Sequence, residues 1–323
     1  MSGLRNEYER RLTQARNHFA ERKSLSMIQD TGLEAELLHI FLVYFSALGV
    51  GMTEPVESWI KRAGERCHEI GLSEIGSALI RHSKQEAGHH RLMIDDVDIL
   101  VRHWNQRRGV RPLDSQALLS PSLPPAVTQY RSLHQRVIEG LAPFAQVAIE
   151  YEIEALSVRY GPALLSQCQR LLPKEALTGL SFLAEHVAID TAHTQFNERQ
   201  LERLLEDRPE SLEDLIDAGV AALNAYGDFL DACLSAANNF LSPNQESAHQ
   251  DIVWSLKPPP GTEPALWRDE LSSFRGRTLW NNGRRPHFLQ HDGTPRDSDS
   301  IQRHATDRVT VPFVSTRVER VAS

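Results

Sequence analysis

The sequence predicts an all-α protein, and three observations favour this fold class. Apolar residues recur at helical spacing almost throughout the chain up to residue 241. The sequence contains no alternation of strand and helix patterns, no glycine-rich phosphate loop and no internal repeat. Aromatic residues make up only 7% of the 323 residues, and the many Ala and Leu favour helices over sheets. We therefore expect a compact helical bundle.

Local signals mark where the expected helices begin and end. Gly49–Gly51 ends a strongly apolar helix, Thr53 and Pro55 start the next, and Ser73 caps a long one. The Pro-rich stretch 111–125 is expected to be a loop. The predicted helices span residues 4–26, 33–48, 55–70, 74–106, 126–139, 142–159, 162–171, 173–205 and 211–241.

The character of the sequence changes beyond Pro243. Pro258–Gly261 and Asn281–Gly283 break any regular pattern, and Arg residues are scattered among Ser and Asp. Five large aromatic residues up to Phe288 are too many for a free linker. We expect residues 1–245 to form a helical domain. Residues 246–323 should form an irregular C-terminal arm that packs on the bundle or on a partner subunit.

One predicted helix carries three potential metal ligands on a single face. His186, Asp190 and His193 lie at offsets of 0, 4 and 7 residues, about two helical turns. Two imidazoles and a carboxylate suit Fe, Mn or Zn, and the mixed nitrogen and oxygen donors lean toward iron. An intrahelical ion pair could explain Asp190 and His193, but it would leave His186 unexplained.

Two further segments supply candidate ligands. Glu86 and His89 form a Glu-x-x-His pair, the unit from which di-iron carboxylate proteins build their centres; the neighbouring His82 and His90 are expected at the surface. The apolar segment 149–156 is interrupted by acids. Glu150 and Glu154 share one helical face there, while Glu152 points elsewhere. A carboxylate in such a helix is costly to bury unless it pairs or binds metal, and spacing alone does not choose between Glu150 and Glu154.

The three segments, in this order, resemble the heme-oxygenase-like di-iron oxidases and oxygenases. Segment 82–89 has the pattern His-x-x-x-Glu-x-x-His with an Asp-containing continuation, segment 154–161 matches Glu-Ala-hydrophobe-Ser-Val ending in Gly, and segment 186–193 matches His-x-x-x-Asp-x-x-His. The resemblance covers roughly residues 30–240 and selects Glu154 over Glu150. It implies a heme-oxygenase-like fold and a centre of two iron ions. The ligands that it implies are Glu86, His89, Glu154, His186, Asp190 and His193.

The resemblance also implies a reaction class. O₂ would be the co-substrate, and a small amine, amino acid or related metabolite would be oxidised. N-oxygenation is the first expectation, and oxidative desaturation or C–C cleavage is the second. No residue beyond the metal ligands is assigned a catalytic role. Arg159 could pair with a substrate carboxylate, but a solvated charge at a helix end is the more common role for such a residue.

Two other classes of protein remain open. A ferritin-like protein, acting in iron oxidation, iron storage or N-oxygenation, would use Glu36 from a second Glu-x-x-His pair, or Glu54. For His39, the partner of Glu36 in that pair, a core histidine is the alternative. A metal-free relative of the same helical fold would bind or hydrolyse a small molecule. The intact set of six ligands argues against the metal-free class.

Composition indicates a soluble, cytoplasmic protein. Hydrophobic residues make up 41% and charged residues 24% of the chain, and a net charge of −8 gives no footprint for nucleic acid. The N-terminus lacks a signal-peptide core, and the apolar run 37–50 is too short to span a bilayer. Cys67, Cys168 and Cys233 are few and far apart, which indicates reduced thiols. We expect no nucleic-acid or membrane partner, and the chain could form a homodimer.

Overall fold

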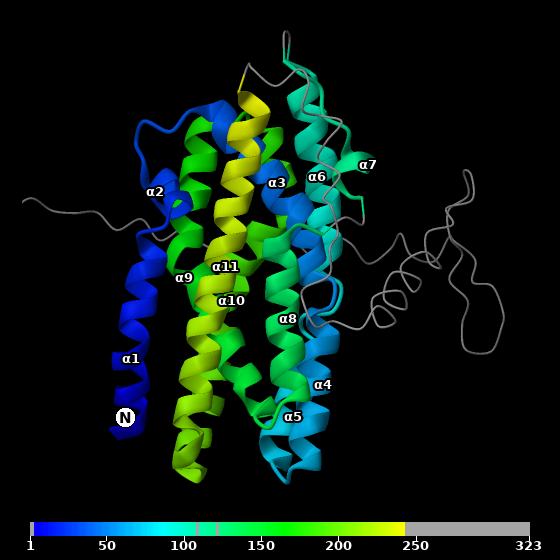
Figure 1. Cartoon of the computed structure of the whole chain (residues 1–323). Coiled ribbons are helices and arrows are strands. Elements are labelled where there is room, and N and C mark those ends of the chain that lie inside the picture. The colour runs from blue at the N-terminus through cyan, green and yellow to red at the C-terminus, as the bar shows by residue number, and fades with distance from the viewer. Residues whose placement is uncertain (1–2, 108–109, 121–122, 243–323) are drawn as a thin grey trace, which may run out of the picture. The chain divides into compact units, whose positions relative to one another are not determined.

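The computed structural model describes residues 3–107, 110–120 and 123–242, which are helical and contain no β-strand (Figure 1). The predicted all-α class is confirmed over this part of the chain. The predicted arm, residues 246–323, and the boundary before it lie outside the described residues. The helices are α1 (Gly3–Ala20), α2 (Lys23–Gln29), α3 (Ala35–Thr53), α4 (Val56–Glu69), α5 (Ser73–Ser83), α6 (His89–Asn105), α7 (Ser115–Leu118), α8 (Pro125–Glu139), α9 (Gln146–Leu171), α10 (Ser181–Asp207) and α11 (Leu212–Leu241).

Helix α3 supplies much of the core because it is apolar around its whole circumference. Its buried residues include Leu38, Phe41 and Val43, and the helix packs against α6, α8 and α11. The stretch Ala35–Glu69 is long and apolar enough to cross a membrane, but 67% of its most apolar window is buried inside the protein. The stretch is therefore a core segment of a soluble helical fold.

The long helices α9, α10 and α11 lie side by side with α1 in the bundle (Figure 1). Helix α9 packs against both α10 and α11, and α10 also contacts α5 and α6. Because each of these helices buries an apolar face against its neighbours, their remaining inward residues meet in the middle of the bundle. This arrangement brings the three predicted ligand segments together.

Two helix boundaries differ from the prediction near the N-terminus. The predicted helix 4–26 is interrupted at Arg22, whose guanidinium lies 2.5 Å from a carboxylate oxygen of Asp228 on α11 and whose backbone is extended. The predicted end at Gly49–Gly51 is wrong, since α3 continues through these glycines. A Cβ at Gly49 would lie 2.6 Å from Met93 Sδ, so the missing side chain allows close packing there.

A third difference concerns α9, which we predicted as two helices. The helix runs unbroken through Pro162. Proline inside a helix costs about 3 kcal/mol, because it removes one hydrogen bond and crowds the preceding turn. Leu164 and Cys168 lie beyond the proline and are buried in the core, and their burial offsets that cost.

Candidate metal centre

The turn between α5 and α6 presents the first group of candidate ligands. We predicted one helix over 74–106, but the helix stops at Ser83 and restarts at His89. Gly88 has φ +86°, a left-handed conformation that breaks the helix at low cost only for glycine. As a result His82 lies in the last turn of α5, Glu86 lies in the turn that follows, and His89 begins α6.

A buried carboxylate fixes the start of α10, which carries the second group. Asp96 on α6 accepts hydrogen bonds from the backbone N–H groups of Ser181, at 2.8 Å, and Phe182, at 3.0 Å. These contacts satisfy amides that the helix itself leaves unpaired. They also set the register from which His186, Asp190 and His193 follow on one face.

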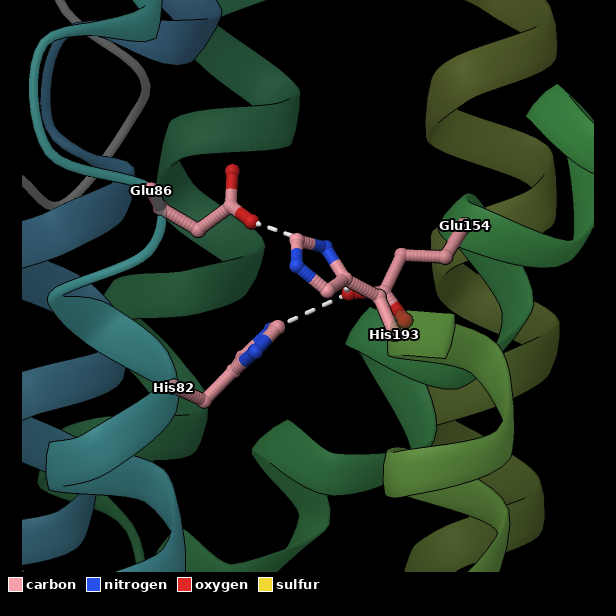
Figure 2. A group of neighbouring side chains, drawn as sticks. All are labelled: His82, Glu86, Glu154 and His193. Atoms are coloured by element: carbon pink, nitrogen blue, oxygen red, sulfur yellow. Dashed lines mark ion pairs between the residues drawn. The ribbon is translucent and has the colours of Figure 1, made fainter. Parts of the chain in front are cut away.

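Four side chains, His82, Glu86, Glu154 and His193, form what we call the inner group (Figure 2). One donor atom from each lies within 4.8 Å of all the others. His193 Nδ1 is 3.3 Å from Glu86 Oε1 and 3.7 Å from Glu154 Oε1, and His82 Nε2 is 3.0 Å from the same Glu154 oxygen. The four residues come from α5, the following turn, α9 and α10, and they point toward one another (Figure 2).

Several donor atoms of this group are buried without a hydrogen-bond partner. They include both ring nitrogens of His82, Oε1 of Glu154 and Nδ1 of His193, and Oδ1 of the neighbouring Asp190 shares the property. Buried polar atoms in folded proteins are nearly always bonded, so a cluster of exceptions calls for an explanation. The donor set, imidazole and carboxylate in close proximity, fits a metal ion.

A second set, the outer group, consists of Glu86, His89 and His186. His89 Nδ1 lies 2.9 Å from Glu86 Oε2, and the His89 and His186 rings are 4.8 Å apart between centroids. His186 Nδ1 lies 2.8 Å from the carbonyl oxygen of Phe182, to which it can donate, and this leaves Nε2 free as a ligand. The outer group is less deeply buried than the inner group and shares Glu86 with it.

The electrostatics follow from crowding acids and imidazoles together. Burial alone would lower the pKa of His82, but the Glu154 carboxylate outweighs it and raises that pKa to about 9. Asp190 and Glu86 raise the pKa of His193 to about 10. Burial would raise the pKa of Glu86, yet His193 and His89 hold it well below its usual range. Imidazolium charges therefore balance the acids, and a metal ion would replace them.

The structure brings most of the predicted ligands together. Glu86, His89, Glu154, His186 and His193 fall into the inner and outer groups. Asp190 belongs to neither group, but it is buried with Oδ1 3.6 Å from His193 Nδ1. Their role as metal ligands stays a prediction.

Sequence reasoning missed His82, which we expected at the surface and which is buried with the inner group. A signal was present: His82, Glu86 and His89 have the same spacing as His186, Asp190 and His193.

The residues of the alternative interpretations lie elsewhere. Glu36 is exposed and paired with Arg107, and Glu54 is exposed, so neither belongs to the inner or outer group. His39 Nε2 lies 2.9 Å from the carbonyl oxygen of Leu100, as expected of a core histidine with one bonded nitrogen. Arg159 is exposed beside the Tyr160 ring, which agrees with a solvated charge.

A cavity of about 150 Å³ adjoins the two groups. Its lining includes Glu86, Glu154, His186 and Asp190 together with Glu150. Most of the remaining lining is apolar, and no Lys or Arg is among the described residues that line it. The large apolar contributors include Phe19, Phe41, Phe45, Tyr160, Leu164 and Phe229.

Comparisons with known proteins bear on the fold. No protein-family model and no curated protein matches the sequence. A domain of unknown function with a heme oxygenase-like fold from Shewanella denitrificans superposes with a TM-score of 0.58 at 17% identity, covering 75% of this chain and 96% of that one. A TenA homologue from Pseudomonas syringae gives 0.56 at 13% identity, covering 72% and 93%. The chain therefore has a heme-oxygenase-like fold, with a buried His/Glu cluster that could hold metal.

Proposed function

We propose that the chain is an O₂-dependent non-heme di-iron oxidoreductase whose metal ions are held by the six predicted ligands, Glu86, His89, Glu154, His186, Asp190 and His193. The observation that carries the proposal is the cluster of buried donor atoms without hydrogen-bond partners beside a cavity. Mixed imidazole and carboxylate ligands are typical of non-heme iron sites. Bound iron would supply the capacity to activate O₂, while the protein sets geometry, polarity and access.

The chain's own residues would divide the work. Glu86 belongs to both groups, so its carboxylate would hold two ions close together. The Phe182 carbonyl would keep the proton on His186 Nδ1 and orient the ring. The apolar cavity walls would keep water away from the reacting centre and strengthen the electrostatic interactions within it.

The cavity favours a small substrate with a mainly apolar body. Its volume of about 150 Å³ is comparable to that of cavities that hold a benzene-sized molecule. A free amino acid would bring an ammonium and a carboxylate, and no Lys or Arg among the described lining residues could pair with the carboxylate. A single polar head group beside Glu86, Glu154 and Asp190 fits better.

Within this class we favour N-oxygenation of an apolar amine. Apolar walls disfavour the ammonium form, and carboxylates that hold metal would no longer stabilise it, so the amine would enter uncharged with its nitrogen lone pair available for oxidation. Oxidative desaturation or C–C cleavage of an apolar acid comes second. In that case the head group would depend on the metal ions for its counter-charge.

The two other classes receive less support. A ferritin-like site would need Glu36 or Glu54, which are exposed and outside both groups. A metal-free binding protein or hydrolase would have to tolerate several buried donor atoms without partners. We further propose a cytoplasmic protein that acts on a small molecule, has no nucleic-acid or membrane partner and could form a homodimer.

Iron loading tests the proposal directly. Protein loaded anaerobically with Fe(II) should retain two ions per chain by elemental analysis and develop a transient visible absorption when O₂ is admitted. Asp190→Ala and His193→Ala should abolish the O₂-dependent absorption while circular dichroism stays helical. His90→Ala is the matched control, because His90 neighbours His89 but belongs to neither group. Wild-type protein that retains no metal would overturn the proposal.

A further inference from the structure

Buried histidines elsewhere in the described chain each have a bonded ring nitrogen. His39 Nε2 lies 2.9 Å from the Leu100 carbonyl oxygen, and His134 Nδ1 lies 2.8 Å from Gln146 Nε2, which donates to it. His82 is equally buried, yet neither of its ring nitrogens has a hydrogen-bond partner. Its Nε2 approaches Glu154 Oε1 to 3.0 Å without hydrogen-bond geometry. The two atoms form an ion pair that is not aligned as a hydrogen bond, so both remain able to bind a third partner.

Neighbouring rings hold His82 in this orientation. The ring stacks on Phe196 at 5.6 Å between centroids, with 23° between the planes. It meets the His193 ring edge-on at 5.2 Å and 87°. Packing of this kind fixes a ligand's orientation before the metal arrives.

The spacing of the two histidine segments supports the same role. His82 and His89 flank Glu86 as His186 and His193 flank Asp190, at offsets of 0, 4 and 7 residues. In space the first histidine of one segment meets the last of the other. His82 lies beside His193, and His89 lies beside His186. Three of these four imidazoles are in the ligand set that the motifs predict, and His82 occupies the fourth equivalent place.

We propose that His82 is a seventh protein ligand and belongs to the inner position, so that the two positions bind metal with unequal affinity, the inner one first. This inference rests on the proposed metal-dependent function. The inner group offers two imidazoles and two carboxylates, all deeply buried except for the shared Glu86. The outer group offers two imidazoles and the shared Glu86, and all three are partly exposed.

Cobalt(II) titration of the metal-free protein, followed by visible absorption and calorimetry, tests this without reference to activity. Wild type should show two classes of site. His82→Ala should weaken the tighter class by at least about tenfold and leave the weaker class in place. His89→Ala should do the reverse, and His90→Ala should match wild type. His82→Gln, which better preserves side-chain volume, should repeat the result if His82→Ala folds poorly by circular dichroism.

The outcomes separate the two proposals. If His82→Ala and His82→Gln both fold and bind cobalt as wild type does, His82 is not a ligand and the proposed function stands on the six other residues. If His82 variants lose only the weaker class, the division into inner and outer positions is wrong. If wild type binds no cobalt, the proposed function itself is overturned.

Discussion

Helix α9 buries acids on two of its faces, and these acids differ in how completely their oxygens are hydrogen-bonded. Glu152 faces α1, where it accepts hydrogen bonds from the Tyr8 hydroxyl at 3.0 Å and from Arg16 Nε at 2.9 Å. Both of its oxygens are bonded, because Arg16 Nε donates to Oε2, while the Tyr8 hydroxyl and Arg16 Nη2, at 2.6 Å, both donate to Oε1. Glu154 faces α10, where one oxygen accepts a bond from Asn197 at 2.8 Å; the other makes no hydrogen bond and lies 3.0 Å from His82 Nε2 as an ion pair.

The difference distinguishes two reasons for burying an acid. A carboxylate with all its bonds made holds helices together and needs no ligand. A carboxylate oxygen without a hydrogen bond is stabilised less fully, even beside an imidazolium, and a ligand that binds there makes up the difference. Glu152 therefore belongs to the architecture, and Glu154 belongs to the candidate metal centre. Four substitutions test this distinction.

The largest effect on stability is expected for Glu152→Gln. The substitution leaves the Arg16 guanidinium without its buried counter-charge, and breaking a buried ion pair costs about 3 to 5 kcal/mol. Arg16 is 21% exposed and also pairs with Glu9, so we expect the lower end, about 3 kcal/mol, in urea denaturation. Metal binding should be unchanged. A variant as stable as wild type would show that the paired acid is dispensable to the fold.

Glu154→Gln should show the opposite pattern. Its metal-free form should lose much less stability than Glu152→Gln, because His82, the ion-pair partner of Glu154, can release its proton when the acid is removed, whereas Arg16 cannot. Metal at 100 times its dissociation constant should stabilise wild type by about 2.7 kcal/mol and the variant far less. Thermal melts with and without Mn(II) measure both quantities. An undiminished metal-induced shift would remove Glu154 from the ligand set.

Glu150, a third acid on α9, should make stability depend on pH. Burial raises its pKa to about 8, so the folded carboxyl keeps its proton where the unfolded chain has lost it. Stability therefore falls as pH rises from about 4.5 to about 8. Between pH 6 and 8, metal-free wild type should lose about 2 kcal/mol relative to Glu150→Gln. Denaturation at several pH values with a chelator present tests this, and parallel pH profiles would contradict it.

The smallest effect is expected for Gly88→Ala. A Cβ at Gly88 would meet nothing within 4 Å, so the cost is the left-handed backbone alone, about 1 to 2 kcal/mol. The turn holds Glu86 between the inner and outer groups, so metal affinity should fall as well. A variant that melts earlier yet binds cobalt normally would show that the turn does not position Glu86.

The helical class and the ligand segments could be predicted from the sequence, because both appear as residues repeated at helical spacing. The sequence did not predict the break at residues 84–88, since His82, Glu86 and His89 also fit one face of an unbroken helix. Gly88 was the available sign, but an isolated glycine is tolerated in many helices. Nor could spacing separate Glu154 from Glu150, because the distinction depends on what α10 places opposite each acid.

The contact between Asp96 and the start of α10 affects which candidate ligands can move when an ion binds. By clamping the first residues of α10 to α6, it makes a fixed frame of the two helices that carry His89 and His186. Glu86 stands outside this frame, on the turn that leads out of α5. When side chains close around an ion, we expect the adjustment to fall on the hinge at residues 84–88. The shared Glu86 carboxylate would then move toward the ion, while His89 and His186 stay in place.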